Sequence, residues 1–247
     1  FAKVDAAMTN LFRFKADLDA ARAVKEAEDK KRAAEQAELD RKAAAEAEAL
    51  RQAEALKEQA KREVAKVEEA VKQNLALVRA NQFAEALEAL PLNAGEIATE
   101  EGRAAMDLAR QRLTRMQDLR EFLIAAIGAE VKAKGAYRYG WLSPNVDVLG
   151  ATAAGVEVRN LPVVPWNRVN LRQMIAFITY FLRPDSEALA TRKERARICL
   201  AVAAYFYECA GGDKVGLKMA ADRAAEAVRL DDSLRDPAKA LLPTLDF

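Results

Sequence analysis

The residue types that most often carry catalysis and metal binding are scarce in this chain of 247 residues. It contains no histidine, which removes the commonest general base, the commonest metal ligand and the usual pH switch near neutrality. Nucleophile pairs that need a histidine are therefore impossible within it. The cysteines, Cys199 and Cys209, fall on one predicted helix about 15 Å apart, which is too far for a disulfide. We therefore expect two small buried thiols, and no catalytic residue, cofactor or metal site.

One segment combines basic and aromatic residues in a way that could contact nucleic acid. Between Ala129 and Leu182 there are six basic and three acidic residues, and aromatic residues interleave in "YRYGW". Small β-barrels of this composition bind single strands by base stacking and phosphate contacts. The candidate contact residues for a partner protein or a nucleic acid are Tyr137, Arg138, Tyr139, Arg159 and Arg168. The alternative, which we favour, is that the aromatic residues fill a small core while the basic residues stay solvated.

These candidates lie in the one part of the chain whose pattern predicts β structure. Four short Val-rich runs, "YGWLS", "VDVLGA", "GVEVRN" and "VVPW", are separated by glycine and turn residues between Tyr139 and Trp166. Four strands of this length are too few for a sandwich and suit a curled sheet or a small open barrel. Trp141 and Trp166 are the predicted large core residues of this module. A short sheet also leaves strand edges that a partner could extend.

The N-terminal region predicts one long helix. All glycines and prolines lie at or after Pro91, and the stretch Arg22–Glu63 carries eleven basic and eleven acidic residues among many alanines. Several acid–base pairs stand four residues apart, an arrangement that stabilises an isolated helix. Large apolar residues in this stretch are too sparse for a heptad seam. We expect a solvated helix that acts as a spacer, with a flexible tail and weak self-association through its alanines as the alternatives.

The remaining segments resemble helical hairpins of the tetratricopeptide type. In "NQFAEALEAL", Asn81 stands at the turn, with Phe83 and Ala86 at the aromatic and small positions of that repeat. The stretch "AADRAAEAVRLDDSL" resembles the second helix of such a repeat, with Asp232 where the family usually has proline. The resemblance implies stacked helical hairpins on both sides of the β module.

These patterns together predict a mainly α protein with a small β insert, in four parts. The parts are a charged helix at 1–63, helical hairpins at 64–128, the β module at 129–169 and C-terminal hairpins at 170–247 that pack on it. This order is similar to accessory C-terminal regions of large bacterial multidomain proteins, some of them anchored signalling kinases. The resemblance implies a non-catalytic region that holds partner proteins.

The composition also bears on partners and compartment. With 39 basic and 38 acidic residues, the chain as a whole gives no reason to expect a polyanion partner. Its longest apolar run, "MIAFITYFL", is far shorter than the ~20 residues that span a bilayer, so we expect no direct membrane contact. Unpaired cysteines favour a reducing compartment such as the cytoplasm. Because the sequence opens on Phe1, we expect a piece of a longer protein, in which an upstream membrane segment stays open as an alternative.

Overall fold

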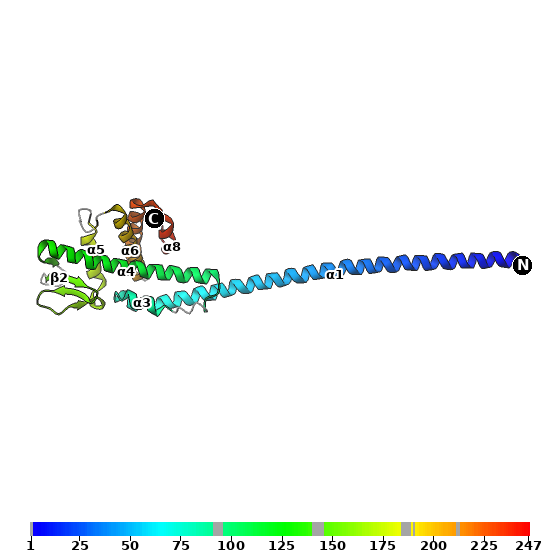
Figure 1. Ribbon diagram of the computed structural model, residues 1–247, viewed down its shortest axis with the longest axis horizontal. Helices are drawn as coiled ribbons and strands as arrows, with labels where there is room; N and C mark the ends of the chain where they lie inside the picture. Colours follow the sequence, from blue (N-terminus) through cyan, green and yellow to red (C-terminus); the bar gives the residue numbers. More distant parts are fainter. Residues whose placement is uncertain (1, 91–95, 140–145, 184–188, 190, 211–212) are drawn as a thin grey trace. The chain divides into compact units, whose positions relative to one another are not determined.

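The structure is a computed structural model that describes residues 2–90, 96–139, 146–183, 189, 191–210 and 213–247. The side chains of residues 2–12, 137–139 and 210 lie outside this description. The chain divides into two compact units, residues 1–59 and 60–247. The predicted fold class is confirmed: the protein is mainly α-helical with a small antiparallel β insert (Figure 1).

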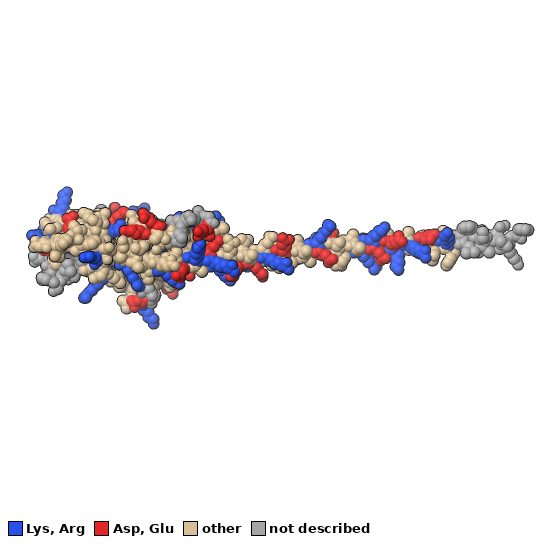
Figure 2. All heavy atoms as spheres, turned by 90° about the horizontal axis from the view of Figure 1, so that it is seen from below, with Lys and Arg blue, Asp and Glu red and all other residues tan. Residues whose placement is uncertain are grey.

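The first unit consists of helix alone, because α1 runs from Ala2 to Gln73 without interruption. Every side chain from Arg13 to Gln59 is exposed to solvent. Acidic and basic side chains alternate along this part of the helix, as Figure 2 shows, and one of the predicted pairs, Glu38 and Lys42, forms an ion pair of 2.8 Å. The helix is thus supported by alanine propensity and by contacts between residues four apart rather than by a core of its own.

The burial of α1 changes at Ala60. From here Ala60, Glu63, Val67 and Ala70 are buried at steps of three and four residues, which is the spacing of one helix face. Ala60 and Glu63, which the sequence pattern assigns to the charged helix, therefore belong to the core of the second unit. The carboxylate of Glu63 accepts hydrogen bonds from the backbone N–H of Thr99 (2.9 Å) and from its hydroxyl (2.5 Å).

Three helices follow α1, and the last of them is the central element of the second unit. These helices are α2 (Leu75–Arg79), α3 (Phe83–Ala89) and α4 (Glu100–Lys134). The hydroxyl of Thr99 caps α4 by accepting the N–H of Gly102. One face of α4 is apolar from Met106 to Ile127, and the helix packs against α3, α5, α6, α8 and the first two strands.

The β insert is an antiparallel sheet in which sequential strands are neighbours. Its strands are β1 (Tyr137–Tyr139), β2 (Val146–Thr152), β3 (Gly155–Val158) and β4 (Val164–Pro165). The register pairs Val148 with Val158 across β2 and β3, and a bulge lies between Val148 and Gly150. Among the described residues β1 and β4 are the two edges, so the sheet is open rather than a closed barrel. The predicted first strand began at Tyr139; the strand observed ends there, and residues 140–145, with Trp141, lie outside the described part.

The C-terminal part of the chain is helical, and three of its helices, α5, α6 and α8, contact α4. Its helices are α5 (Leu171–Phe181), α6 (Arg192–Ala210), α7 (Lys214–Leu230) and α8 (Arg235–Leu241), with the short 3-10 turns η1 (Trp166–Arg168) and η2 (Asp232–Leu234). Asn170 begins α5 with a complete capping box. Helices α6 and α7 pack along each other, and α6 buries both Cys199 and Cys209, as predicted.

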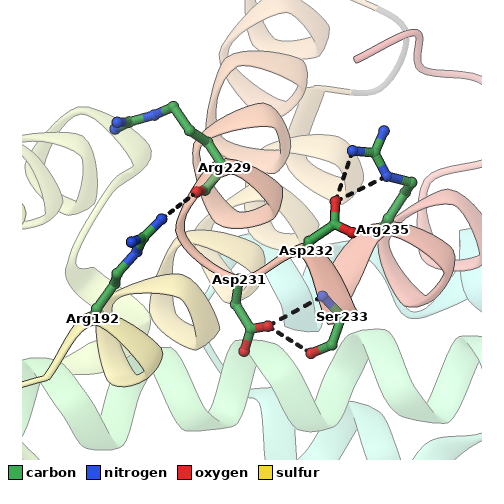
Figure 3. Close-up of polar contacts among 6 residues, drawn as sticks. All are labelled: Arg192, Arg229, Asp231, Asp232, Ser233 and Arg235. Carbon is green, nitrogen blue, oxygen red and sulfur yellow. Dashed lines mark hydrogen bonds and ion pairs between the residues drawn. The ribbon is translucent and has the colours of Figure 1, made fainter.

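Side-chain contacts stabilise the corner between α7 and α8 (Figure 3). The carboxylate of Asp231 accepts hydrogen bonds from the backbone N–H (3.1 Å) and the hydroxyl (2.6 Å) of Ser233. The guanidinium of Arg235 donates to Asp232 at 2.7 Å, and Arg192 on α6 donates to the carbonyl of Arg229 at 2.8 Å. These contacts fix the path of the chain between α7 and α8.

Candidate functional site

The candidate contact residues fall on adjacent parts of the β insert. Tyr137, Arg138 and Tyr139 form β1, but their side chains lie outside the described part; in the register Arg138 stands opposite Asp147. Arg159 directly follows β3, and its Nε lies 3.0 Å from a carboxylate oxygen of Asp147. Arg168 lies on η1 and is exposed. The sheet therefore brings Arg138 and Arg159 next to the same acidic residue.

Ion pairing reduces the basic excess that the sequence shows in this region. Lys134 pairs with Glu130 at 2.6 Å, and Arg159 pairs with Asp147. The described residues provide no ion-pair partner for three exposed cations, Lys132, Arg168 and Arg172. Two cations on one short stretch, Arg168 and Arg172, are thus available to an acidic partner, which is far fewer than a strongly salt-dependent nucleic-acid binder uses.

The same region of the sequence contributes exposed apolar side chains. Among the described residues of the second unit, five large apolar side chains are exposed, and four of them lie between Leu149 and Leu171. Leu161 is 50% exposed and Val163 is 47% exposed, on either side of Pro162 in the connection from β3 to β4. We call Leu149, Leu161, Val163 and Leu171, together with Arg168 and Arg172, the insert surface. Exposed apolar residues beside unpaired charge are typical of interaction sites.

The connection that carries Leu161 and Val163 is fixed at both ends. Asn160 adopts a left-handed conformation with φ of 62°, and the N–H of Leu161 turns back to the carbonyl of Val158. At the far end, Trp166 is buried as predicted, and its indole N–H donates to the carbonyl of Thr152 at 2.8 Å. The exposed residues are therefore presented by a connection anchored to the sheet.

A buried asparagine holds the segment that follows. The side-chain amide of Asn81 donates to the carbonyls of Trp166 (3.1 Å) and Val169 (2.7 Å), and its oxygen accepts the hydroxyl of Tyr205 at 3.3 Å. Its own carbonyl accepts a hydrogen bond from Arg120 at 3.2 Å. This one residue thus joins the α2–α3 turn to η1, α4 and α6. The sequence pattern placed Asn81 at the turn, but nothing in it indicated the hydrogen bonds with these distant segments.

A charged cluster lies where α4 meets α5. The hydroxyl of Tyr180 donates to the carboxylate of Glu130, and the guanidinium of Arg183 lies 4.0 Å from the centroid of the Tyr180 ring. Burial acts to raise the pKa of Glu130, but the hydrogen bonds from Lys134 and Tyr180 outweigh it and lower that pKa below its usual range. Glu130 is therefore ionised at neutral pH and serves to hold α5 against α4.

The second unit also contains an open cavity of about 300 Å³. It is lined by Val71, Lys72, Leu75, Tyr207, Glu208, Leu217 and Thr244, which come from four separate segments of the chain. Next to it, Arg112 donates to Glu208 (2.9 Å) and to the carbonyl of Leu241 (2.8 Å). These contacts join α4 to α6 and α8, so the ion pair of Arg112 and Glu208 has a structural role.

The two thiols of the chain are buried. Burial raises the pKa of both thiols, Cys199 and Cys209, to about 12, so both are protonated at neutral pH. No group of three or more metal-ligating side chains occurs among the residues that the structure describes. In the same part of the chain no helix is both long enough and apolar enough to cross a bilayer.

Comparisons with protein-family models, with curated proteins and with solved structures give no significant match for this sequence.

Proposed function

We propose that residues 60–247 are a non-catalytic protein-interaction region of a larger bacterial protein, and that residues 1–59 are its helical spacer. The observation that carries the proposal is the composition of the insert surface, which combines four exposed apolar side chains with two exposed arginines that have no ion-pair partner among the described residues. Such a surface complements a segment of a partner protein that carries both apolar and acidic side chains. The resemblance to accessory regions of bacterial multidomain proteins supports the same class of function.

The second candidate function is binding of single-stranded nucleic acid, which the basic residues of the insert favour. The ion pair of Arg159 with Asp147 counts against it, because a neutralised guanidinium gains less from a phosphate. The exposed apolar residues also differ from the aromatic platforms on which bases stack. We therefore rank a protein partner first.

The test is selection of a phage-displayed peptide library against the full chain, followed by binding measurements with the enriched peptides. We expect these peptides to combine apolar and acidic residues, and Leu161→Asp to weaken their binding at least about tenfold, or 1.4 kcal/mol. Val215→Asp is the matched control, since Val215 is 67% exposed but lies on α7, away from the insert. Both variants should keep the thermal midpoint of the parent chain.

Two outcomes would overturn the proposal. One is a selected peptide whose affinity is the same for the parent chain and for Leu161→Asp. The other is binding of a labelled single strand that disappears between about 50 and 200 mM salt and is lost in Arg168→Ala, which would establish the nucleic-acid function instead.

A further inference from the structure

The first three heptads of α1 differ in sequence from the rest of that helix. In the sequence, apolar residues recur at alternating steps of three and four, the a and d positions of a coiled coil. We call this set the N-terminal seam: Val4, Ala7, Leu11, Phe14, Leu18 and Ala21. At the next four positions of the same register the chain has Lys25, Glu28, Arg32 and Glu35. The apolar seam therefore ends where the charged part of the helix begins.

The described part of the seam is exposed. Phe14 is 69% exposed and Leu18 is 42% exposed, and every other side chain described from Arg13 to Gln59 is exposed as well. Burying an aromatic or leucine side chain contributes about 1.5–3 kcal/mol. Phe14 and Leu18 lie one turn apart on one helix face, so packing against a partner helix would bury both and stabilise the pair.

We propose that the N-terminal seam pairs with the same seam of a second copy of this chain, in a short parallel coiled coil. The charged residues beside the seam favour a second copy as the partner and a parallel orientation of the two helices. In the seam's register Asp17 occupies position g and Arg22 the following position e. In a parallel pair these residues face each other across the interface with opposite charge. In an antiparallel pair that buries the same seam, Asp17 at position g stands opposite Asn10 of the other copy and Lys15 at position e opposite Met8, so neither charge gains an opposite charge.

The polar residues of the same segment argue against a membrane as the partner. Helices that lie in a membrane surface carry a polar face rich in lysine and arginine. Here the polar positions mix both signs, with Asp5, Asp17 and Asp19 beside Arg13 and Lys15. A second copy offers charges of both signs to these side chains, whereas an anionic lipid surface repels the three aspartates. Pairing would also present two interaction regions in one assembly, which strengthens binding to a multivalent partner.

The experiment is sedimentation equilibrium of the full chain across protein concentrations of about 1–100 µM, the range of a short coiled coil's dissociation constant. We expect a monomer–dimer equilibrium, and an increase in the dissociation constant of at least about tenfold in Phe14→Ser. Leu50→Ser is the control, because Leu50 is 66% exposed on the same helix but lies outside the seam. It should leave the equilibrium unchanged, although it introduces the same residue type.

Charge reversal tests the direction of pairing. Asp17→Arg alone should weaken the dimer, and adding Arg22→Asp should restore it, since the pair then has opposite charge again. A monomeric parent chain at the highest concentration, or an equal effect of Leu50→Ser and Phe14→Ser, would overturn the proposal. Failure of the double variant to restore pairing would overturn the parallel arrangement. Binding of the parent chain to phosphatidylserine vesicles, lost in Phe14→Ser, would replace the second copy with a membrane.

Discussion

Replacing Asn81 by alanine should strongly lower the free energy of unfolding of the second unit, although the side chain removed is small. The change removes the amide that donates to the carbonyls of Trp166 and Val169 and leaves the hydroxyl of Tyr205 without its acceptor. Asn81 is fully buried, so water does not replace these partners. The residue also has a φ of 55°, a conformation that asparagine tolerates better than alanine.

The magnitude follows from these contacts. Leaving the Val169 carbonyl without this donor costs about 1–3 kcal/mol, and the weaker bond to Trp166, whose carbonyl keeps the N–H of Val169, adds about 0.5–1.5 kcal/mol. The left-handed backbone adds about 1–2 kcal/mol. We therefore expect a loss of about 3–6 kcal/mol, a large part of the stability of a typical domain.

Urea denaturation of the full chain, followed by tryptophan fluorescence, measures this loss. A change of that size shifts the midpoint by on the order of 2 M. Asn81→Gly is the matched control: it removes the same hydrogen bonds but accepts the positive φ, so it should be about 1 kcal/mol more stable than the alanine variant. If the free energy of unfolding of the alanine variant lies within about 1 kcal/mol of the parent chain, the hydrogen bonds of Asn81 do not stabilise the fold as argued. If the glycine variant is no more stable than the alanine variant, the positive φ of Asn81 makes no contribution.

Three further changes test other parts of the fold. Trp166→Ala should cost about 3–5 kcal/mol in the same urea experiment, and an unchanged midpoint would show that this indole is not part of the core. Gly102→Ala should cost about 1–3 kcal/mol, because an added Cβ would lie 2.6 Å from a carboxylate oxygen of α1; Gly128→Ala, where a Cβ meets nothing within 4 Å, should cost nothing. With their pKa raised to about 12, Cys199 and Cys209 should not react with Ellman's reagent at pH 8 in the folded chain, whereas two thiols should react in urea. Rapid reaction of the folded chain would mean that the thiols are accessible.

Local sequence signals predicted much of this structure because their causes lie within a few residues. The absence of glycine and proline before Pro91 and the acid–base pairs four apart predicted the long helix α1. Thr99 and Asn170, which cap α4 and α5, are residue types that favour the start of a helix. The Val-rich runs located the β insert, although the first strand lies two residues earlier than its pattern indicated.

The candidate site was only partly predictable, because exposure and ion pairing depend on residues far apart in the sequence. The list of basic residues was available from composition, but the strand register decided that Arg159 is neutralised by Asp147 while Arg168 has no acidic partner among the described residues. The exposure of Leu161 and Val163 could have been suspected from their place beside Pro162, which ends the strand alternation. Only the packed insert shows them outside its core.

The sequence by itself determined where the helices begin, where the strands gather and that histidine chemistry is absent, since each of these depends on residue type and short-range spacing. The tertiary structure alone decided which polar groups are buried. Glu63 looks like one more charge on a solvated helix, and Asn81 like an ordinary turn residue. Yet Glu63 accepts hydrogen bonds from Thr99, the residue that caps α4, and Asn81 joins three distant segments. Their roles come from backbone groups 36 to 88 positions away in the chain. Contacts over such separations leave no periodic signal, because a single buried hydrogen bond constrains one position rather than a pattern.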